Sequence, residues 1–179
     1  MKENIQLVPL TKELIKDVNA ANDPFTIFGR IEPSLDSGTW SYKEVLYPDA
    51  KEIQFPDDQL NWNDYIHNQN KALFLAYLKE ECIGQVRITK ELNRFGYIEN
   101  IAVKKEFRKH GIGWLLLDKA EEWAKENFLI GLSLEMQDDN VGACRFYIRY
   151  GFKLGGVDNY RYYTNPNMDK ALFWYKVFS

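Results

Sequence analysis

Residues 107–114 read F-R-K-H-G-I-G-W, and the rest of the chain is organised around this stretch. It lies between an apolar run at 97–103, expected to be a strand, and a segment at 113–127 with helical periodicity. Gly111 and Gly113 let the backbone approach a ligand closely, where a new helix presents unpaired N–H groups. Three consecutive residues add positive charge there: Arg108, Lys109 and His110. The stretch predicts a phosphate-binding loop that opens a helix.

Length and composition favour one ordinary globular domain spanning 1–179. The chain is 45% hydrophobic and 27% charged, and its aromatic content of 15% is high. Because the N-terminus carries no apolar signal segment and no long apolar run follows, we expect a cytoplasmic protein that does not bind membranes.

Cysteine and charge usage narrow the functional classes. Cys82 and Cys144 are too few for a disulfide framework, and with two histidines they form no zinc-like spacing, so no metal site is expected. Residues 1–70 hold 6 basic against 12 acidic side chains, and residues 71–179 hold 17 against 14. The acidic first part is compatible with a cationic partner, and the absence of a basic stripe argues against nucleic acid.

On the N-terminal side of the loop, a strand at 5–10 and a helix starting at Thr11 are expected first. The stretch 22–70 contains several prolines but is too aromatic for a disordered linker, so we expect a folded, irregular or short-helical segment. It would form either a wall of the binding pocket or a layer over the core. Three antiparallel strands are then expected at 72–79, 82–89 and 96–103.

On the C-terminal side, the amphipathic helix at 113–127 leads to a strand at 129–136, expected to be a parallel neighbour of 97–103. A second helix should run from Asn140 to about Tyr150 and end at Gly151. Two further strands are expected at 152–163 and 170–178, joined by the turn-rich sequence T-N-P-N-M-D. The predicted fold is α/β, with a mixed, mostly antiparallel central sheet of six or seven strands and helices on both faces.

Two motifs in this order identify a family. The first is R-x-x-G-x-G at 108–113, after a strand and before a helix; the second is N-x-x-A-x-x-F-Y-x-x-x-G-F at 140–152. Together they resemble the GNAT superfamily of acetyl-coenzyme A (acetyl-CoA) dependent N-acetyltransferases. Within it the chain is similar to the streptothricin acetyltransferases, in Y-I-E-N-I-A-V-K-K-E-F-R at 97–108, E-M-Q-D-D-N at 135–140 and, more loosely, P-F-T-I-F-G-R-I at 24–31.

The resemblance implies a binding site for acetyl-CoA. Backbone N–H groups of the loop would hold its pyrophosphate, and the strand before the loop would bond its pantetheine arm and the acetyl carbonyl, with the N–H of Ile101 the expected oxyanion donor. Asn140 caps its helix by default and, by resemblance, also contacts the pantetheine. The implied cofactor residues are Ile101, Ala102, Val103, Arg108, Lys109, His110, Gly111, Ile112, Gly113, Asn140, Ala143 and Tyr147.

The implied reaction is direct attack of an amine on the thioester. A lysine-like amine has a pKa of about 10.4, so leaving it neutral at pH 7 costs roughly 3 to 5 kcal/mol, and a proton acceptor is needed. Glu99 and Glu135 are the candidates, although either could simply hold a cationic substrate or face solvent; we prefer Glu99. Tyr147 is the expected general acid for the leaving thiolate, and its alternative reading is an aromatic core residue.

The acceptor site depends on less specific signals. Four aromatic residues are candidates for its wall, with core packing as the alternative for each: Trp40, Tyr42, Tyr65 and Tyr97. The expected acceptor is a primary amine of streptothricin, on its β-lysine moiety. A polyamine, an aminoglycoside, a protein lysine or N-terminus, and a non-catalytic acetyl-CoA-binding module remain alternatives. The final aromatic strand could also pair with another copy of the chain in a homodimer.

Overall fold

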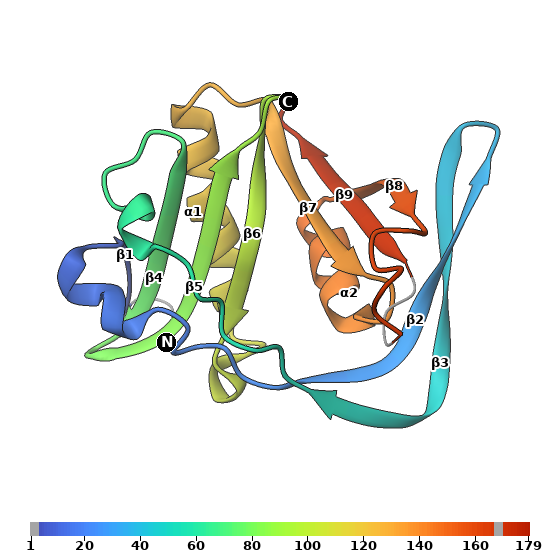
Figure 1. Cartoon of the computed structure of the whole chain (residues 1–179), viewed down its shortest axis with the longest axis horizontal. Helices are drawn as coiled ribbons and strands as arrows, with labels where there is room; N and C mark the ends of the chain where they lie inside the picture. Colours follow the sequence, from blue (N-terminus) through green and yellow to red (C-terminus); the bar gives the residue numbers. More distant parts are fainter. Residues whose placement is uncertain (1–3, 167–169) are drawn as a thin grey trace. The chain divides into compact units, whose positions relative to one another are not determined.

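A computed structural model describes residues 4–166 and 170–179. Seven strands form one mostly antiparallel sheet in the order β1-β4-β5-β6-β7-β9-β8, and β2 and β3 pair separately (Figure 1). The predicted α/β fold is therefore confirmed. Contacts divide the chain into two compact units: unit one contains 1–24, 54–132 and 178, and unit two contains 25–53, 133–177 and 179.

Unit one contains four of the sheet strands and the helix that follows the glycine loop. The strands are β1 (Ile5–Pro9), β4 (Lys71–Leu78), β5 (Glu81–Lys90) and β6 (Phe95–Val103). Short 3-10 turns are η2 (Lys12–Asp17), η3 (Trp62–Tyr65) and η4 (Lys105–Phe107), and α1 spans Ile112–Glu126. The three strands predicted before the loop are confirmed within one residue. The helix predicted after Thr11 is wrong in type, because only a 3-10 turn forms there and Thr11 makes no side-chain cap.

The core of unit one follows from the periodicity of α1. Its buried residues recur at helical spacing and pack on β4, β5 and β6 (Figure 1): Ile112, Leu116, Leu117, Ala120, Trp123 and Ala124. Gly84 lies under this helix, where an added Cβ would come within 3.1 Å of Leu116 Cδ1 and of the Ala102 carbonyl oxygen. A second cluster around Leu73, Leu75 and Tyr65 is packed by residues of η2 and η3. Helix and strands in this unit are thus fixed by apolar burial.

Unit two contains the long hairpin and the C-terminal strands. The hairpin consists of β2 (Phe25–Asp36) and β3 (Thr39–Ile53), and the remaining elements are β7 (Gly131–Gln137), α2 (Val141–Tyr150), β8 (Lys153–Asp158) and β9 (Ala171–Val177). The first two residues of β7 belong to unit one. The strand predicted at 152–163 ends earlier, at Asp158. Part of the predicted T-N-P-N-M-D turn, residues 167–169, lies outside the described residues.

The hairpin corrects the expectation of an irregular or short-helical segment for residues 25–53, whereas 54–70 is irregular apart from the 3-10 turn η3, as expected. Its turn is Ser37-Gly38, with φ values of 50° and 78°, and Asp36 pairs with Thr39 across it. Two successive positive φ angles match the right-handed twist of paired strands, so this Ser-Gly pair makes a tight hairpin turn. Ile27 and Ile31 are buried at even spacing on β2. Within the same unit, the Ile31 amide donates to the Asp138 carbonyl (2.7 Å).

Candidate active site

Glu99 projects from an irregularity in β6. On β5, Arg87 pairs with Asn100 and the next residue, Ile88, pairs with Ile98, so Glu99 is an extra residue in the ladder. Such a β-bulge bends the strand and re-aims the side chain, and bulges are common beside functional sites. The bulge gives Glu99 a direction that regular alternation would not.

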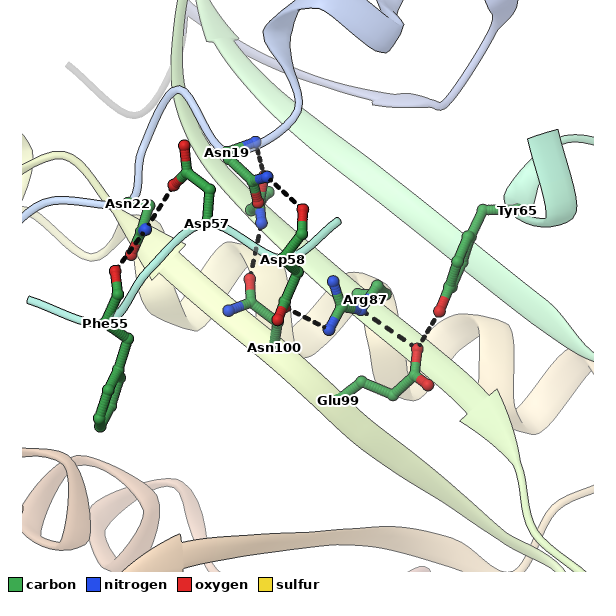
Figure 2. Close-up of polar contacts among 10 residues, drawn as sticks. Asn19, Asn22, Phe55, Asp57, Asp58, Tyr65, Arg87, Glu99 and Asn100 are labelled. Atoms are coloured by element: carbon green, nitrogen blue, oxygen red, sulfur yellow. Dashed lines mark hydrogen bonds and ion pairs between the residues drawn. The ribbon is translucent and has the colours of Figure 1, made fainter. Parts of the chain in front are cut away.

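The Glu99 carboxylate is held by two other side chains (Figure 2). The Tyr65 hydroxyl donates to Glu99 Oε2 (2.7 Å), and Arg87 Nε lies 3.2 Å from the same oxygen. Burial, followed by this hydrogen bond, raises the pKa of Tyr65 well above its usual value, so the hydroxyl keeps its proton. Tyr65, predicted as a wall of the acceptor pocket, is a buried partner of the candidate base.

Arg87 is almost completely buried and is enclosed on several sides. Its Nη2 donates to Asp58 Oδ2 (2.8 Å). Its guanidinium carbon lies 5.7 Å from the ring centroid of Trp62 and 5.9 Å from that of Tyr65. A buried charge is stable only when it is paired, and here two carboxylates share one guanidinium. Sequence reasoning missed this group. The available signal was a charged residue between Val86 and Ile88 in an otherwise buried strand.

Arg108, the first residue of the R-x-x-G-x-G motif, donates to backbone carbonyls. Its Nε donates to Val103 (2.8 Å), its Nη1 to Pro24 (2.7 Å) and its Nη2 to Asp23 (3.2 Å). The Lys105 amide donates to the Asp23 carboxylate (2.7 Å). The side chain of Arg108 therefore ties the end of β6 to the segment at 23–24. The predicted residues Ile101, Ala102 and Val103 occupy this end of β6, paired with β5.

The start of α1 fits an anionic group. Gly111 has φ +83° and immediately precedes the helix, whose first turn contains no acidic residue. The first N–H groups of a helix have no acceptor within it, and the helix dipole is positive at this end. Lys109 and His110 are exposed beside it. Ile112 is buried and anchors the first turn, so its side chain serves packing rather than binding.

In unit two, α2 places the residues of the second motif. Asn140 Oδ1 accepts from the Ala143 amide (3.2 Å), which confirms the predicted helix cap. Gly151 ends the helix with φ +106°, as predicted. Tyr147 is largely buried, and its ring packs edge-on against Phe152 with the centroids 5.5 Å apart.

Glu135 lies on β7 in unit two and has partners on both carboxylate oxygens. The Tyr162 hydroxyl donates to Oε1 (2.7 Å), and Arg161 Nε lies 3.0 Å from Oε2. The side chain is 10% exposed. Glu135 therefore anchors the segment that follows β8. Both of its carboxylate oxygens have partners, whereas the two partners of Glu99 contact the same oxygen.

The remaining aromatic candidates occupy different elements. Trp40 and Tyr42 lie on β3, and Tyr42 packs edge-on against the buried Trp174 with centroids 5.9 Å apart. Burial, with a smaller contribution from Glu44, raises the pKa of Tyr42. Tyr97 lies on β6 opposite Thr89. Unit one therefore carries Tyr65 and Tyr97, and unit two carries Trp40 and Tyr42.

The family profile of the acetyltransferase (GNAT) family matches residues 35–152. The chain belongs to the GNAT acetyltransferase family. It is 42% identical over 173 residues to streptothricin acetyltransferase A of Bacillus subtilis (strain 168), an alignment that covers 96% of this chain and 99% of that protein. Both motifs that suggested the family lie inside the matched region.

Solved structures resemble this GNAT chain over almost its whole length. A protein of Bacillus anthracis strain Ames, assigned as a streptothricin acetyltransferase and crystallised with acetyl-CoA, is 31% identical with a TM-score of 0.88 and 98% coverage of both chains. Nourseothricin acetyltransferase is 25% identical with a TM-score of 0.80, covering 97% of this chain and 98% of that one.

The described residues contain neither a metal-binding cluster nor a membrane-spanning helix. No group of three or more His, Cys, Asp or Glu side chains within 4–166 and 170–179 is arranged to hold a metal ion. In the same part of the chain, no helix combines the length and apolar character needed to cross a bilayer.

Proposed function

We propose that this GNAT enzyme transfers the acetyl group of acetyl-CoA to a primary amine of streptothricin, on its β-lysine moiety, and so inactivates the antibiotic. The observation that carries the proposal is the 42% identity to a streptothricin acetyltransferase along nearly the full length of both proteins. That alignment extends beyond the cofactor motifs, and the N-terminal half is where we expect the acceptor to be selected. The excess of acidic residues in 1–70 suits a polycationic acceptor.

The start of α1 would hold the phosphates of acetyl-CoA, with Gly111 permitting close approach and Lys109 adding positive charge beside His110. Backbone groups at the end of β6, from Ile101 to Val103, would orient the pantetheine and the acetyl carbonyl. When bound, acetyl-CoA supplies an activated acetyl thioester. Asn140 and Ala143 would contribute through the start of α2, and the guanidinium of Arg108 would act by fixing the loop.

Glu99 would accept the proton of the acceptor amine. It is preferred to Glu135 because both oxygens of Glu135 already have partners, whereas both contacts to Glu99 fall on one oxygen. Tyr147 would donate the proton that the leaving thiolate requires. In water a tyrosine has a pKa near 10 and a thiol has a pKa near 8.5, so this proton transfer is uphill by about 2 kcal/mol. The site must therefore reduce the difference between the two pKa values.

The acceptor is tested by measuring thiol release from acetyl-CoA with purified protein. Streptothricin, a polyamine, an aminoglycoside and a peptide with a free N-terminus and a lysine should be compared by kcat/KM. We expect streptothricin to be preferred and its product to gain one acetyl group on β-lysine by mass spectrometry. Equal kcat/KM for all acceptors would contradict the proposed substrate, and no thiol release with any would favour a binding module.

The role of Tyr147 is tested with Tyr147→Phe at saturating acetyl-CoA. We expect kcat to fall by about two orders of magnitude, the usual contribution of a positioned general acid. Tyr150→Phe is the matched control, because Tyr150 is equally buried on the same helix and has no proposed role. An unchanged kcat in Tyr147→Phe would exclude the acid role.

A further inference from the structure

We propose that Tyr65 and Arg87 are positioning residues that anchor Glu99 by Oε2 and leave Oε1 to receive the proton of the acceptor amine. This inference deepens the proposed function and rests on it for the identity of the amine. It assigns different roles to the two oxygens of one carboxylate: Oε2 is held in place and Oε1 accepts the proton. All the residues concerned lie in unit one.

The contacts to Glu99 are one-sided. Tyr65 Oη lies 2.7 Å and Arg87 Nε 3.2 Å from Oε2, and no hydrogen bond from a described residue reaches Oε1. Figure 2 shows both partners approaching the same oxygen, with the other directed away from them. The Glu99 side chain is 22% exposed, so Oε1 is accessible without disturbing the buried pair.

The anchoring groups are themselves buried and held by further contacts. Arg87 is 6% exposed along its side chain, is bonded to Asp58 and lies over the rings of Trp62 and Tyr65. Tyr65 is 5% exposed and packs in the cluster around Leu73 and Leu75. The terminal torsion of a free glutamate is broad, so anchoring one oxygen removes rotational freedom that would otherwise disperse Oε1.

The charge on Glu99 suits a cationic acceptor. Asp58 and Glu99 carry two negative charges against one on Arg87, and Lys71 adds a second positive charge, so the cluster as a whole is neutral. Lys71 lies over the outer part of the cluster, with Nζ 5.4 Å from the centroid of the Tyr65 ring. An arriving ammonium group would be attracted to the carboxylate oxygen that Tyr65 and Arg87 do not contact.

The proton step is balanced by these groups alone. An N–H bond of the ammonium breaks, an O–H bond forms at Glu99 Oε1, and the electron pair stays on nitrogen, which becomes nucleophilic. A general base must lie about 2.6 to 3.2 Å from the proton-bearing atom, so the fixed direction of Oε1 matters as much as its basicity. After this step Glu99 is neutral, and its Oε2 still accepts the hydrogen bond from the Tyr65 hydroxyl.

The kinetic test compares Tyr65→Phe with Tyr77→Phe. Both changes remove a hydroxyl that donates to a carboxylate in unit one, but the partner of Tyr77 is Asp17. We expect Tyr65→Phe to lower kcat/KM for streptothricin about tenfold, the equivalent of one hydrogen bond to a charged group, and to do so by lowering kcat rather than by raising KM. The control should shift neither. Added to Glu99→Gln, Tyr65→Phe should have no further effect, and an equal loss in both backgrounds would overturn the proposal.

A second readout does not depend on the acceptor. Carbon-13 NMR relaxation of glutamate side chains, with Glu99 assigned by its loss in Glu99→Gln, reports the mobility of this carboxylate directly. Tyr65→Phe should increase that mobility because it removes one of the two contacts that hold Oε2. Unchanged mobility in Tyr65→Phe would overturn the inference whatever the enzyme acetylates. Increased mobility without streptothricin turnover would instead reject only the proposed function.

Discussion

At the scale of single residues, the structure separates charged side chains that face solvent from those paired inside the protein. Arg108 is part of a motif that suggests phosphate binding, yet its guanidinium donates to three carbonyls, two of them at 23–24. Arg87 stands in an apolar run and holds the carboxylate of Glu99. In both cases the residue type was visible in the sequence, but its partners come from distant parts of the chain.

Burial of the Cys144 thiol makes the stability of the protein depend on pH. Its thiol contacts the Met136 sulfur (3.4 Å), and burial raises its pKa to about 12. Since the folded protein keeps this proton and the unfolded chain loses it above about pH 9, the unfolded state binds fewer protons in that range. Stability contributed by the protonated thiol is therefore complete below about pH 9 and is lost as pH rises toward 12.

We expect the free energy of unfolding, measured with urea, to fall between about pH 8.5 and pH 10.5, with Cys144 contributing at most about 1.4 kcal/mol per pH unit. Cys144→Ala will be less stable at neutral pH, but its stability should decline less steeply over this range. Equal slopes for the two proteins would mean that the thiol is not protected by burial.

At the scale of elements, local signals fixed both α-helices. The amphipathic pattern of α1, the cap of α2 at Asn140 and its end at Gly151 are short-range features, and the structure reproduces each. Local signals do not predict the hairpin of β2 and β3, because Pro33 and Pro48 interrupt the strand pattern on either side of the Ser37-Gly38 turn. Strand pairing over so long a hairpin is decided by the partner strand and by burial, which no single window contains.

The cap of α2 gives a prediction at this scale. Asn140→Ala removes the bond to the Ala143 amide and should lower the free energy of unfolding by about 1 kcal/mol. Asn140→Ser retains a capping oxygen and should stay within a few tenths of a kcal/mol of the parent protein. Urea unfolding of the three proteins measures both effects, and the same loss in both variants would show that the amide group serves something other than capping.

At the scale of the whole molecule, the chain passes between the two units repeatedly. Unit one takes 1–24 and 54–132, unit two takes 25–53 and 133–177, and β7 begins in one and ends in the other. Neither unit is a continuous stretch of sequence. Neither can therefore be produced as a single fragment of the chain without including part of the other. The single domain expected from length, the cytoplasmic location and the homodimer through the last strand stay predictions.

We expect one cooperative unfolding transition for the whole chain. Fluorescence can follow both units at once, because Trp123 is buried in unit one and Trp174 in unit two. Two variants, one keeping only Trp123 and the other only Trp174 among the five tryptophans, should give urea unfolding curves of similar midpoint and cooperativity, in which the fluorescence and the far-ultraviolet circular dichroism coincide. Two resolved transitions would show that the units fold independently and would contradict the single domain.

By itself the sequence determined the glycine loop between strand and helix, the two α-helices, the succession of strands around them and the GNAT motifs, because helical periodicity, capping and glycine conformations act over a few residues. Only the tertiary structure decided the hairpin at 25–53, the bulge that aims Glu99, and its anchoring by Tyr65 and Arg87. Those features depend on strand register and on buried charges, whose partners lie far apart along the chain and meet only when the core is formed.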